Sequence, residues 1–195
     1  METDKKILKI LLKDLAIKPT ISSLAGDIGM SRVGLWKVLK KMESKKIISL
    51  SPIGSGKTST YTIGLNWDNA LTGKTLAVAL TEDALKNQRW ASNFSELENK
   101  VDFLIIYGSI LHSIKEAKDI DILAIANKNK FLEIEEIIRK IQKTQNKKIH
   151  YLIFTNSEFI HEIEIPNKSF IDALKKGVVL FGQEKFIKFM KNVKR

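Results

Sequence analysis

Two acidic residues, Asp119 and Asp121, have a type and a spacing suited to binding a divalent cation. They begin an apolar run that continues to Ala126 and is typical of a buried strand. Because residues two apart on a strand point to the same face, both carboxylates can approach one ion. Carboxylate oxygens are the ligands that hard cations such as Mg²⁺ prefer. The pair therefore predicts a metal site at the start of a strand.

A second candidate site stands just before this pair. The apolar run Leu104–Tyr107 is typical of another buried strand, and it ends in Gly108 and Ser109. Glycine has no Cβ, so a phosphate oxygen could approach main-chain N–H groups there, and the serine hydroxyl can donate to the same anion. This turn is therefore a candidate phosphate site facing the metal site.

The combined pattern is Gly-Ser, nine residues and Asp-x-Asp, flanked by apolar runs, and it resembles the signature of the minimal nucleotidyltransferases of the polymerase-beta-like superfamily. The resemblance covers about residues 101–190 and implies an α/β (α+β) nucleotidyltransferase fold for residues 101–195. It implies that Gly108 and Ser109 bind the phosphates of ATP or another NTP. It also implies that Asp119 and Asp121 are catalytic and bind Mg²⁺. The alternative is an ordinary β-α-β unit with two solvated aspartates.

The chain departs from this family at one position. Catalytic members carry a third carboxylate on the strand after the first crossover helix, but residues 137–157 contain no Asp or Glu. His150 is the nearest match to that position, as a metal ligand or a base. Glu158, at the start of the next predicted helix, is the other candidate. A histidine that is merely hydrogen-bonded on a strand is the alternative interpretation of His150.

The N-terminal third has a different pattern. Apolar residues at helical spacing predict a helix at about residues 3–17, a short helix capped by Thr20 and ended by Gly29, and a basic helix capped by Ser31. A β-hairpin is expected from Ile47–Leu50 and Tyr61–Ile63. Three helices followed by a hairpin resemble a winged helix-turn-helix domain, here residues 1–66.

This resemblance implies binding to duplex DNA. Residues 1–66 carry twelve Lys and Arg against five Asp and Glu, a net charge of +7, and residues 67–195 carry the remaining +4 of the total of +11. Such a basic domain suits a polyanionic partner. The expected DNA contacts are Arg32, Trp36, Lys37, Lys40 and, at the wing tip, Lys57. A winged helix that serves dimerisation or protein docking is the alternative.

The remaining segments predict the scaffold. Residues 67–100 are expected to form a helical linker, with a second helix capped at Thr81. After the Asp-x-Asp strand, a helix over residues 131–143 and further strands and helices predict α/β layers. The residues expected to face inward on that helix are Leu132, Ile134, Ile137, Ile138 and Ile141.

Composition excludes several classes of site. The absence of cysteine excludes disulfides and thiolate metal sites. No apolar run approaches the roughly 20 residues of a membrane span, and residues 1–18 lack the apolar core of a signal peptide. We therefore expect a soluble cytoplasmic protein with no membrane partner.

Two hypotheses follow. The first is a DNA-binding protein whose nucleotidyltransferase domain transfers a nucleotidyl group from Mg-NTP to a hydroxyl and releases pyrophosphate. Family resemblance implies a toxin–antitoxin role with a HEPN-type toxin as acceptor, an RNA acceptor being the alternative. The second is a transcriptional regulator whose nucleotidyltransferase domain senses a nucleotide without turnover. A homodimer is compatible with both.

Overall fold

The computed structural model of the protein describes residues 2–14, 19–54, 60–164 and 168–193. The chain is a mixture of helices and strands with one two-stranded and one mixed four-stranded sheet. It divides into two compact units between Ala79 and Leu80, within helix α4 (Ala70–Lys86). None of the helices in these ranges has the length and apolarity needed to cross a bilayer.

The first unit begins with the three predicted helices. Their bounds are α1 (Glu2–Lys13), α2 (Ile21–Ile28) and α3 (Arg32–Ser44). Thr20 caps α2 and forms a capping box with Ser23. Gly29 ends that helix at φ 75°, a left-handed conformation that glycine adopts without a steric penalty. Ser31 caps α3 by accepting a hydrogen bond from the N–H of Gly34. Both predicted caps are confirmed, and residues 15–17 of the first predicted helix lie outside the described residues.

The predicted hairpin is also present. Strands β1 (Ile48–Ile53) and β2 (Thr60–Leu65) are antiparallel, with Ile48 opposite Leu65. The hairpin joins the helices because the N–H of Ile63 donates to the carbonyl of Pro19. The core of the unit is aliphatic and includes Ile7, Leu8, Leu12, Leu24, Leu35, Leu39, Met42 and Ile63.

The segment predicted as a linker divides between the two units. Helix α4 runs through Thr81 without a break, so the predicted cap at this residue is wrong. Buried Leu80 and Ala84 continue one apolar face past Thr81, whose side chain lies on the exposed side of the helix. Helix α5 (Gln88–Asn93) and the 3₁₀ turn η1 (Ser95–Leu97) follow. Their apolar side chains, with Trp90 the largest, belong to the core of the second unit.

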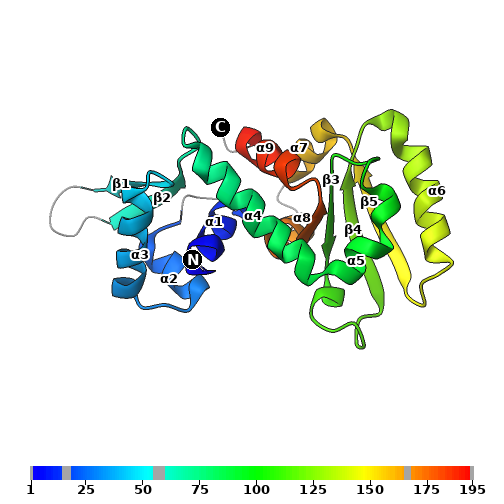
Figure 1. Ribbon diagram of the computed structural model, residues 1–195, viewed down its shortest axis with the longest axis horizontal. Coiled ribbons are helices and arrows are strands. Elements are labelled where there is room, and N and C mark those ends of the chain that lie inside the picture. The colour runs from blue at the N-terminus through cyan, green and yellow to red at the C-terminus, as the bar shows by residue number, and fades with distance from the viewer. Residues whose placement is uncertain (1, 15–18, 55–59, 165–167, 194–195) are drawn as a thin grey trace. The chain divides into compact units, whose positions relative to one another are not determined.

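The second unit is built on a four-stranded sheet (Figure 1). The strands are β3 (Phe103–Tyr107), β4 (Asp119–Ile125), β5 (Lys148–Phe154) and β6 (Val178–Phe181), in the order β5-β4-β3-β6. Strand β3 is antiparallel to both of its neighbours, whereas β4 and β5 are parallel. The parallel pair requires a crossover, which helix α6 (Phe131–Gln142) supplies.

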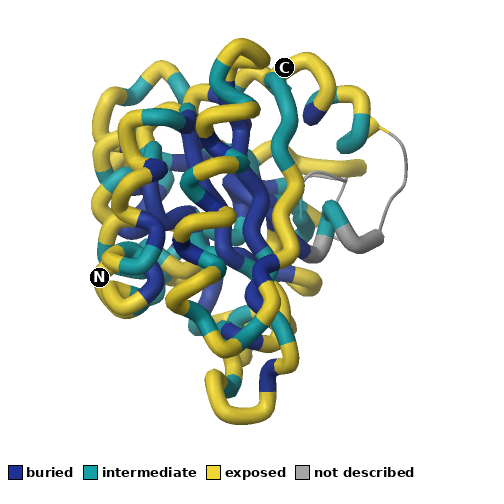
Figure 2. Tube along the Cα trace, turned by 90° about the vertical axis from the view of Figure 1, so that its right-hand side faces the viewer, coloured by how far each residue is buried: buried dark blue, intermediate teal, exposed yellow. Residues whose placement is uncertain are grey.

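Helices cover both faces of this sheet. Helices α5 and α6 pack on the face that carries Leu104, Ile106 and Ile122. The second face is covered by α7 (Asn156–Glu164), α8 (Lys168–Lys176) and α9 (Gln183–Val193). There the ring of Phe103 lies 5.3 Å from Phe186, centroid to centroid. The central strands β3 and β4 are buried along most of their length. Figure 2 shows the buried residues of the chain in dark blue.

One inward residue was wrongly predicted. Leu132 is 74% exposed, whereas Ile134, Ile138 and Ile141 are buried. At 100° per residue, Leu132 lies about 160° from Ile134 and therefore on the opposite side of α6. Phe131 occupies the inward position at this end of the helix instead.

Candidate functional site

Asp119 and Asp121 lie on one face of β4, beginning at its first residue. Ile120, between them, is buried on the opposite face, in the core beneath α5 and α6. The side chains of Asp119 and Asp121 are 33% and 23% exposed. Strand alternation thus brings the two carboxylates together and leaves both accessible to a ligand from solvent.

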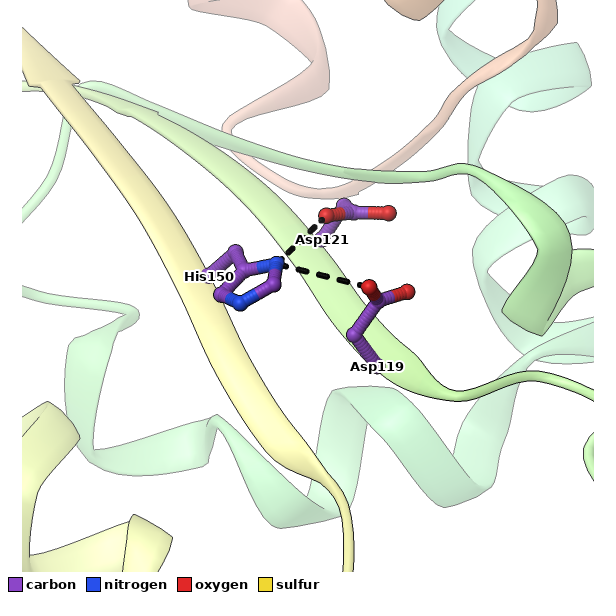
Figure 3. A group of neighbouring side chains, drawn as sticks. All are labelled: Asp119, Asp121 and His150. Carbon is purple, nitrogen blue, oxygen red and sulfur yellow. Dashed lines mark ion pairs between the residues drawn. The ribbon is translucent and has the colours of Figure 1, made fainter.

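His150 lies beside this pair on the neighbouring strand. Because β4 and β5 are parallel and in register, His150 is directly opposite Asp121. Its Nδ1 atom lies 3.5 Å from Oδ2 of Asp119 and 3.6 Å from Oδ1 of Asp121 (Figure 3). These distances allow an ion pair when the imidazole is protonated. The histidine is therefore on the same face of the sheet as the aspartates.

The Gly-Ser turn approaches the same carboxylates from β3. Tyr107, the last residue of β3, is opposite Asp121, and Gly108 follows with φ 84° and ψ −164°. A Cβ atom at Gly108 would lie 2.4 Å from Oδ2 of Asp121. A side chain at this position would therefore displace the Asp121 carboxylate, and the positive φ separately favours glycine. Ser109 is exposed and begins a 3₁₀ turn, η2 (Ser109–Leu111), whose leading N–H groups have no partner within the turn.

The charges of the pair influence the groups around it. Burial raises the pKa of Asp121, the nearby carboxylate of Asp119 raises it further, and His150 lowers it. Burial also raises the pKa of Tyr107, as do Asp121 and Asp119. The phenol therefore stays protonated at neutral pH and can donate a hydrogen bond. Sequence reasoning did not assign Tyr107 to the site, although its place beside Gly108 at a strand end was a usable signal.

Two further features shape the surroundings. The ammonium group of Lys147 donates to the carbonyl of Ala117, which ties the loop before Asp119 to the start of β5.

A cavity of about 280 Å³ adjoins the Gly-Ser turn. It is lined by Tyr107, Gly108, Ser109, Leu111, His112, Ala173 and Lys176. A ligand on the turn would therefore have an adjacent space with both apolar and basic side chains.

Glu158, the other candidate for a third acid, has a different place. Its Oε2 accepts hydrogen bonds from the N–H and the hydroxyl of Thr155, at 2.8 and 2.9 Å. This is a capping box at the start of α7, and these hydrogen bonds lower the pKa of Glu158. Strand β5 ends at Phe154, opposite Ile125, at the other end of β4 from Asp119. Glu158 is therefore a helix cap, remote from the aspartates.

The donor set fits a divalent cation. Asp119, Asp121 and His150 offer ligand atoms within 4.8 Å of one another, and they form the one such group in the described part of the chain. Two carboxylates provide the oxygen ligands that Mg²⁺ prefers, whereas an imidazole is more typical of transition metals. Of the three side chains, the two aspartates match the oxygen ligands that Mg²⁺ prefers, and the imidazole of His150 matches them less well.

The four residues of α3 expected to contact DNA differ in their surroundings. Arg32 and Lys37 are exposed. Lys40 forms an ion pair of 2.8 Å with Glu43 and lies 5.0 Å above the ring of Trp36. Trp36 in turn packs on Tyr61 of β2, with ring centroids 5.2 Å apart. The indole thus holds α3 against the hairpin.

Lys57, the expected contact at the wing tip, lies outside the described residues. The chain matches no protein-family model, no curated protein and no solved structure.

Proposed function

We propose that the protein is a winged helix-turn-helix DNA-binding protein whose second unit is a minimal nucleotidyltransferase domain that binds Mg-NTP. One observation carries the proposal. Asp119, Asp121, Gly108 and Ser109 come from two separate stretches of sequence, and all four meet where β3 ends and β4 begins. Phosphate-binding and metal-binding groups at a common point are what a metal–nucleotide complex requires.

In this proposal each residue has its own task. Asp119 and Asp121 hold the metal ion. When bound, Mg²⁺ would neutralise charge on the phosphates and orient them. Gly108 allows the phosphates to approach the main chain, Ser109 donates its hydroxyl to them, and the protonated phenol of Tyr107 is a further donor.

A second candidate function is a nucleotide sensor without turnover, and His150 favours it. By family resemblance, a catalytic domain should carry a third carboxylate beside the pair, but the described residue closest to Asp119 and Asp121 on β5 is this histidine. A neutral imidazole adds no negative charge with which to hold a second Mg²⁺ or to activate an acceptor hydroxyl. Normal Mg-NTP binding with slow or absent transfer is the expected behaviour of such a site.

The first unit supports the DNA part of the proposal. Its predicted order of three helices and a hairpin is present, and α3 carries exposed Arg32 and Lys37. Basic side chains on one helix can contact phosphates and release counterions on docking.

The test is equilibrium binding of each labelled NTP with and without Mg²⁺, followed by a transfer assay with RNA and candidate protein acceptors, a HEPN-type toxin among them. Binding that requires Mg²⁺ and is lost in Asp119→Asn with Asp121→Asn supports the proposal. Glu135→Gln with Glu136→Gln removes two acids from α6 and is the matched control. Transfer that appears in His150→Asp but not in the wild type identifies a sensor. NTP binding that is unchanged in the aspartate double variant would refute the metal–nucleotide site.

A further inference from the structure

His150 brings a nitrogen donor to the two aspartates. Its Nδ1 atom lies 3.5 Å from Oδ2 of Asp119 and 3.6 Å from Oδ1 of Asp121, so one ring nitrogen faces both carboxylates (Figure 3). Elsewhere in the described ranges, no three acidic or histidine side chains come close enough to share an ion. The cluster is therefore a mixed set of oxygen and nitrogen donors, not a purely acidic one.

The strands hold these donors in place. Strands β4 and β5 are hydrogen-bonded in register, and Ile149, next to His150, is buried on the opposite face of the sheet. Gln142, the last residue of α6, fixes the outer edge of β5. Its Oε1 accepts a hydrogen bond from the N–H of Ile149 at 2.7 Å, and its Nε2 donates to the carbonyl of Lys147 at 3.0 Å. A donor on a strand fixed in this way needs little rearrangement to bind an ion.

The spacing of the donors discriminates between ions. Ligands bonded at about 2.05 Å lie about 3.4 Å apart around a tetrahedral ion such as Zn²⁺. At the same bond length, neighbouring ligands of an octahedral Mg²⁺ ion lie only about 2.9 Å apart. The separations of 3.5 and 3.6 Å between Nδ1 of His150 and the two carboxylates are closer to the tetrahedral value. Zn²⁺ would thus require less movement of these side chains than Mg²⁺ would.

The chemistry of the donors favours the same ion. Two carboxylates balance the charge of any divalent cation, so charge does not distinguish Zn²⁺ from Mg²⁺. The imidazole does distinguish them, because neutral histidine is a common ligand of transition-metal ions, whereas Mg²⁺ prefers oxygen. Three protein ligands leave a further position on Zn²⁺, and the partial exposure of all three side chains keeps the cluster open to solvent.

We propose that Asp119, Asp121 and His150 form a transition-metal site that binds Zn²⁺ in preference to Mg²⁺, with Nδ1 of His150 as the third protein ligand. The proposal rests on the cluster alone and does not require the proposed nucleotide binding. The competing arrangement is a protonated His150 that pairs with the two carboxylates and takes the place of an ion. In that arrangement His150 would hinder metal binding instead of supporting it.

Equilibrium binding of Zn²⁺ alone, and of Mg²⁺ alone, to the untagged full-length protein without nucleotide tests the proposal. His150→Ala should weaken Zn²⁺ binding at least about tenfold, because the loss of a ligand should exceed the effect of losing an outer-shell partner. His161→Ala removes an exposed histidine of α7 outside the cluster and is the matched control, which should bind Zn²⁺ as the wild type does. Zn²⁺ binding that is equal in the two variants, or tighter in His150→Ala, would overturn the proposal.

A second measurement needs no variant. Co²⁺ accepts the ligands of a Zn²⁺ site and absorbs visible light far more strongly in a tetrahedral site than in an octahedral one. The wild type loaded with Co²⁺ should show the strong tetrahedral bands, and excess Zn²⁺ should remove them at much lower concentration than Mg²⁺ does. Weak octahedral bands, or displacement by Mg²⁺ as readily as by Zn²⁺, would refute a site of this kind.

The result is separable from the test of the proposed function. A wild type that binds Mg-NTP, but binds Zn²⁺ no better than Mg²⁺, would remove this inference and leave the proposed function standing. A wild type that binds Zn²⁺ through His150 but binds no NTP would support this inference and refute the proposed nucleotide site.

Discussion

Gly108 and Asp121 are so close that a side chain on Gly108 would displace the Asp121 carboxylate: a Cβ atom there would lie 2.4 Å from Oδ2 of Asp121. The backbone of Gly108, at φ 84° and ψ −164°, is also in a region that is almost restricted to glycine. Two independent constraints, one conformational and one steric, therefore act on the residue that joins the proposed phosphate turn to the proposed metal ligand.

Gly108→Ala should both destabilise the protein and displace the Asp121 carboxylate. We expect a loss of about 1–3 kcal/mol of unfolding free energy from backbone strain alone, measured by urea denaturation. The affinity for Mg-NTP should fall as well. Gly26→Ala, in helix α2, is the control. The new methyl group meets no atom within 4 Å, and alanine favours helix more than glycine does, so this variant should be at least as stable as the wild type. If Gly108→Ala were as stable as the wild type, the described conformation of the turn would be contradicted.

Asp121→Asn should stabilise the metal-free protein at neutral pH. Burial and Asp119 raise the pKa of this carboxyl in the folded state, so its stabilising contribution is lost as pH rises through that pKa. The amide does not ionise and avoids this loss. The denaturation midpoint of the variant should exceed that of the wild type at about pH 7, with a smaller difference at about pH 4.

Added Mg²⁺ should make the wild type more stable than Asp121→Asn at neutral pH, because only the wild type gains binding free energy from the ion. Glu136→Gln, at an exposed position on α6, is the control and should show neither effect. A variant that is less stable than the wild type at about pH 7 without metal would show that the aspartates do not repel each other as described.

Glu158→Gln should affect helix capping and not nucleotide binding. Hydrogen bonds from Thr155 lower the pKa of Glu158, so its contribution is present above the unfolded pKa and is lost as pH falls through the folded pKa. The variant should melt at a lower temperature than the wild type at neutral pH, and the two should converge in acid. Its affinity for Mg-NTP should equal that of the wild type. A large loss of affinity for Mg-NTP in this variant would mean that Glu158 does contribute to the site.

Lys37→Ala should weaken DNA binding more than Lys40→Ala does. Lys37 is exposed on α3, whereas Lys40 is already paired with Glu43 and lies over Trp36. Each lost phosphate contact should reduce the slope of log K against log salt by about 0.9. Titrations of duplex DNA at several salt concentrations measure both quantities. Equal losses in the two variants would mean that Glu43 releases Lys40 on binding.

The local patterns in the sequence predicted most elements of the fold. Caps at Thr20 and Ser31 act within one turn of chain, so the residue types alone identify them. The same local reasoning failed at Thr81, because the sequence alone does not distinguish a threonine that caps a helix from one on the exposed side of a continuous helix. It failed at Leu132 because an apolar residue can extend into solvent when its position on the helix faces outward.

Spacing within one strand placed Asp119 and Asp121 together, whereas Gly108, Ser109 and His150 were assigned to the site from the turn composition and the family resemblance. Asp119 and Asp121 are on one face because they are two residues apart, which the sequence states directly. The positions of Tyr107 and His150 beside Asp121 depend on the pairing register of β3, β4 and β5, which is a long-range property. The same register separates Glu158 from the pair, and no spacing along the chain could have shown this.

The most direct test of the central claim is an anomalous difference map from crystals grown with Mn²⁺ and a non-hydrolysable NTP analogue. Mn²⁺ accepts the oxygen ligands that suit Mg²⁺ and can be located by its anomalous scattering. The account predicts a peak within bonding distance of both Asp119 and Asp121, with the phosphates against Gly108 and Ser109. A peak elsewhere, or a nucleotide bound away from this turn, would contradict it.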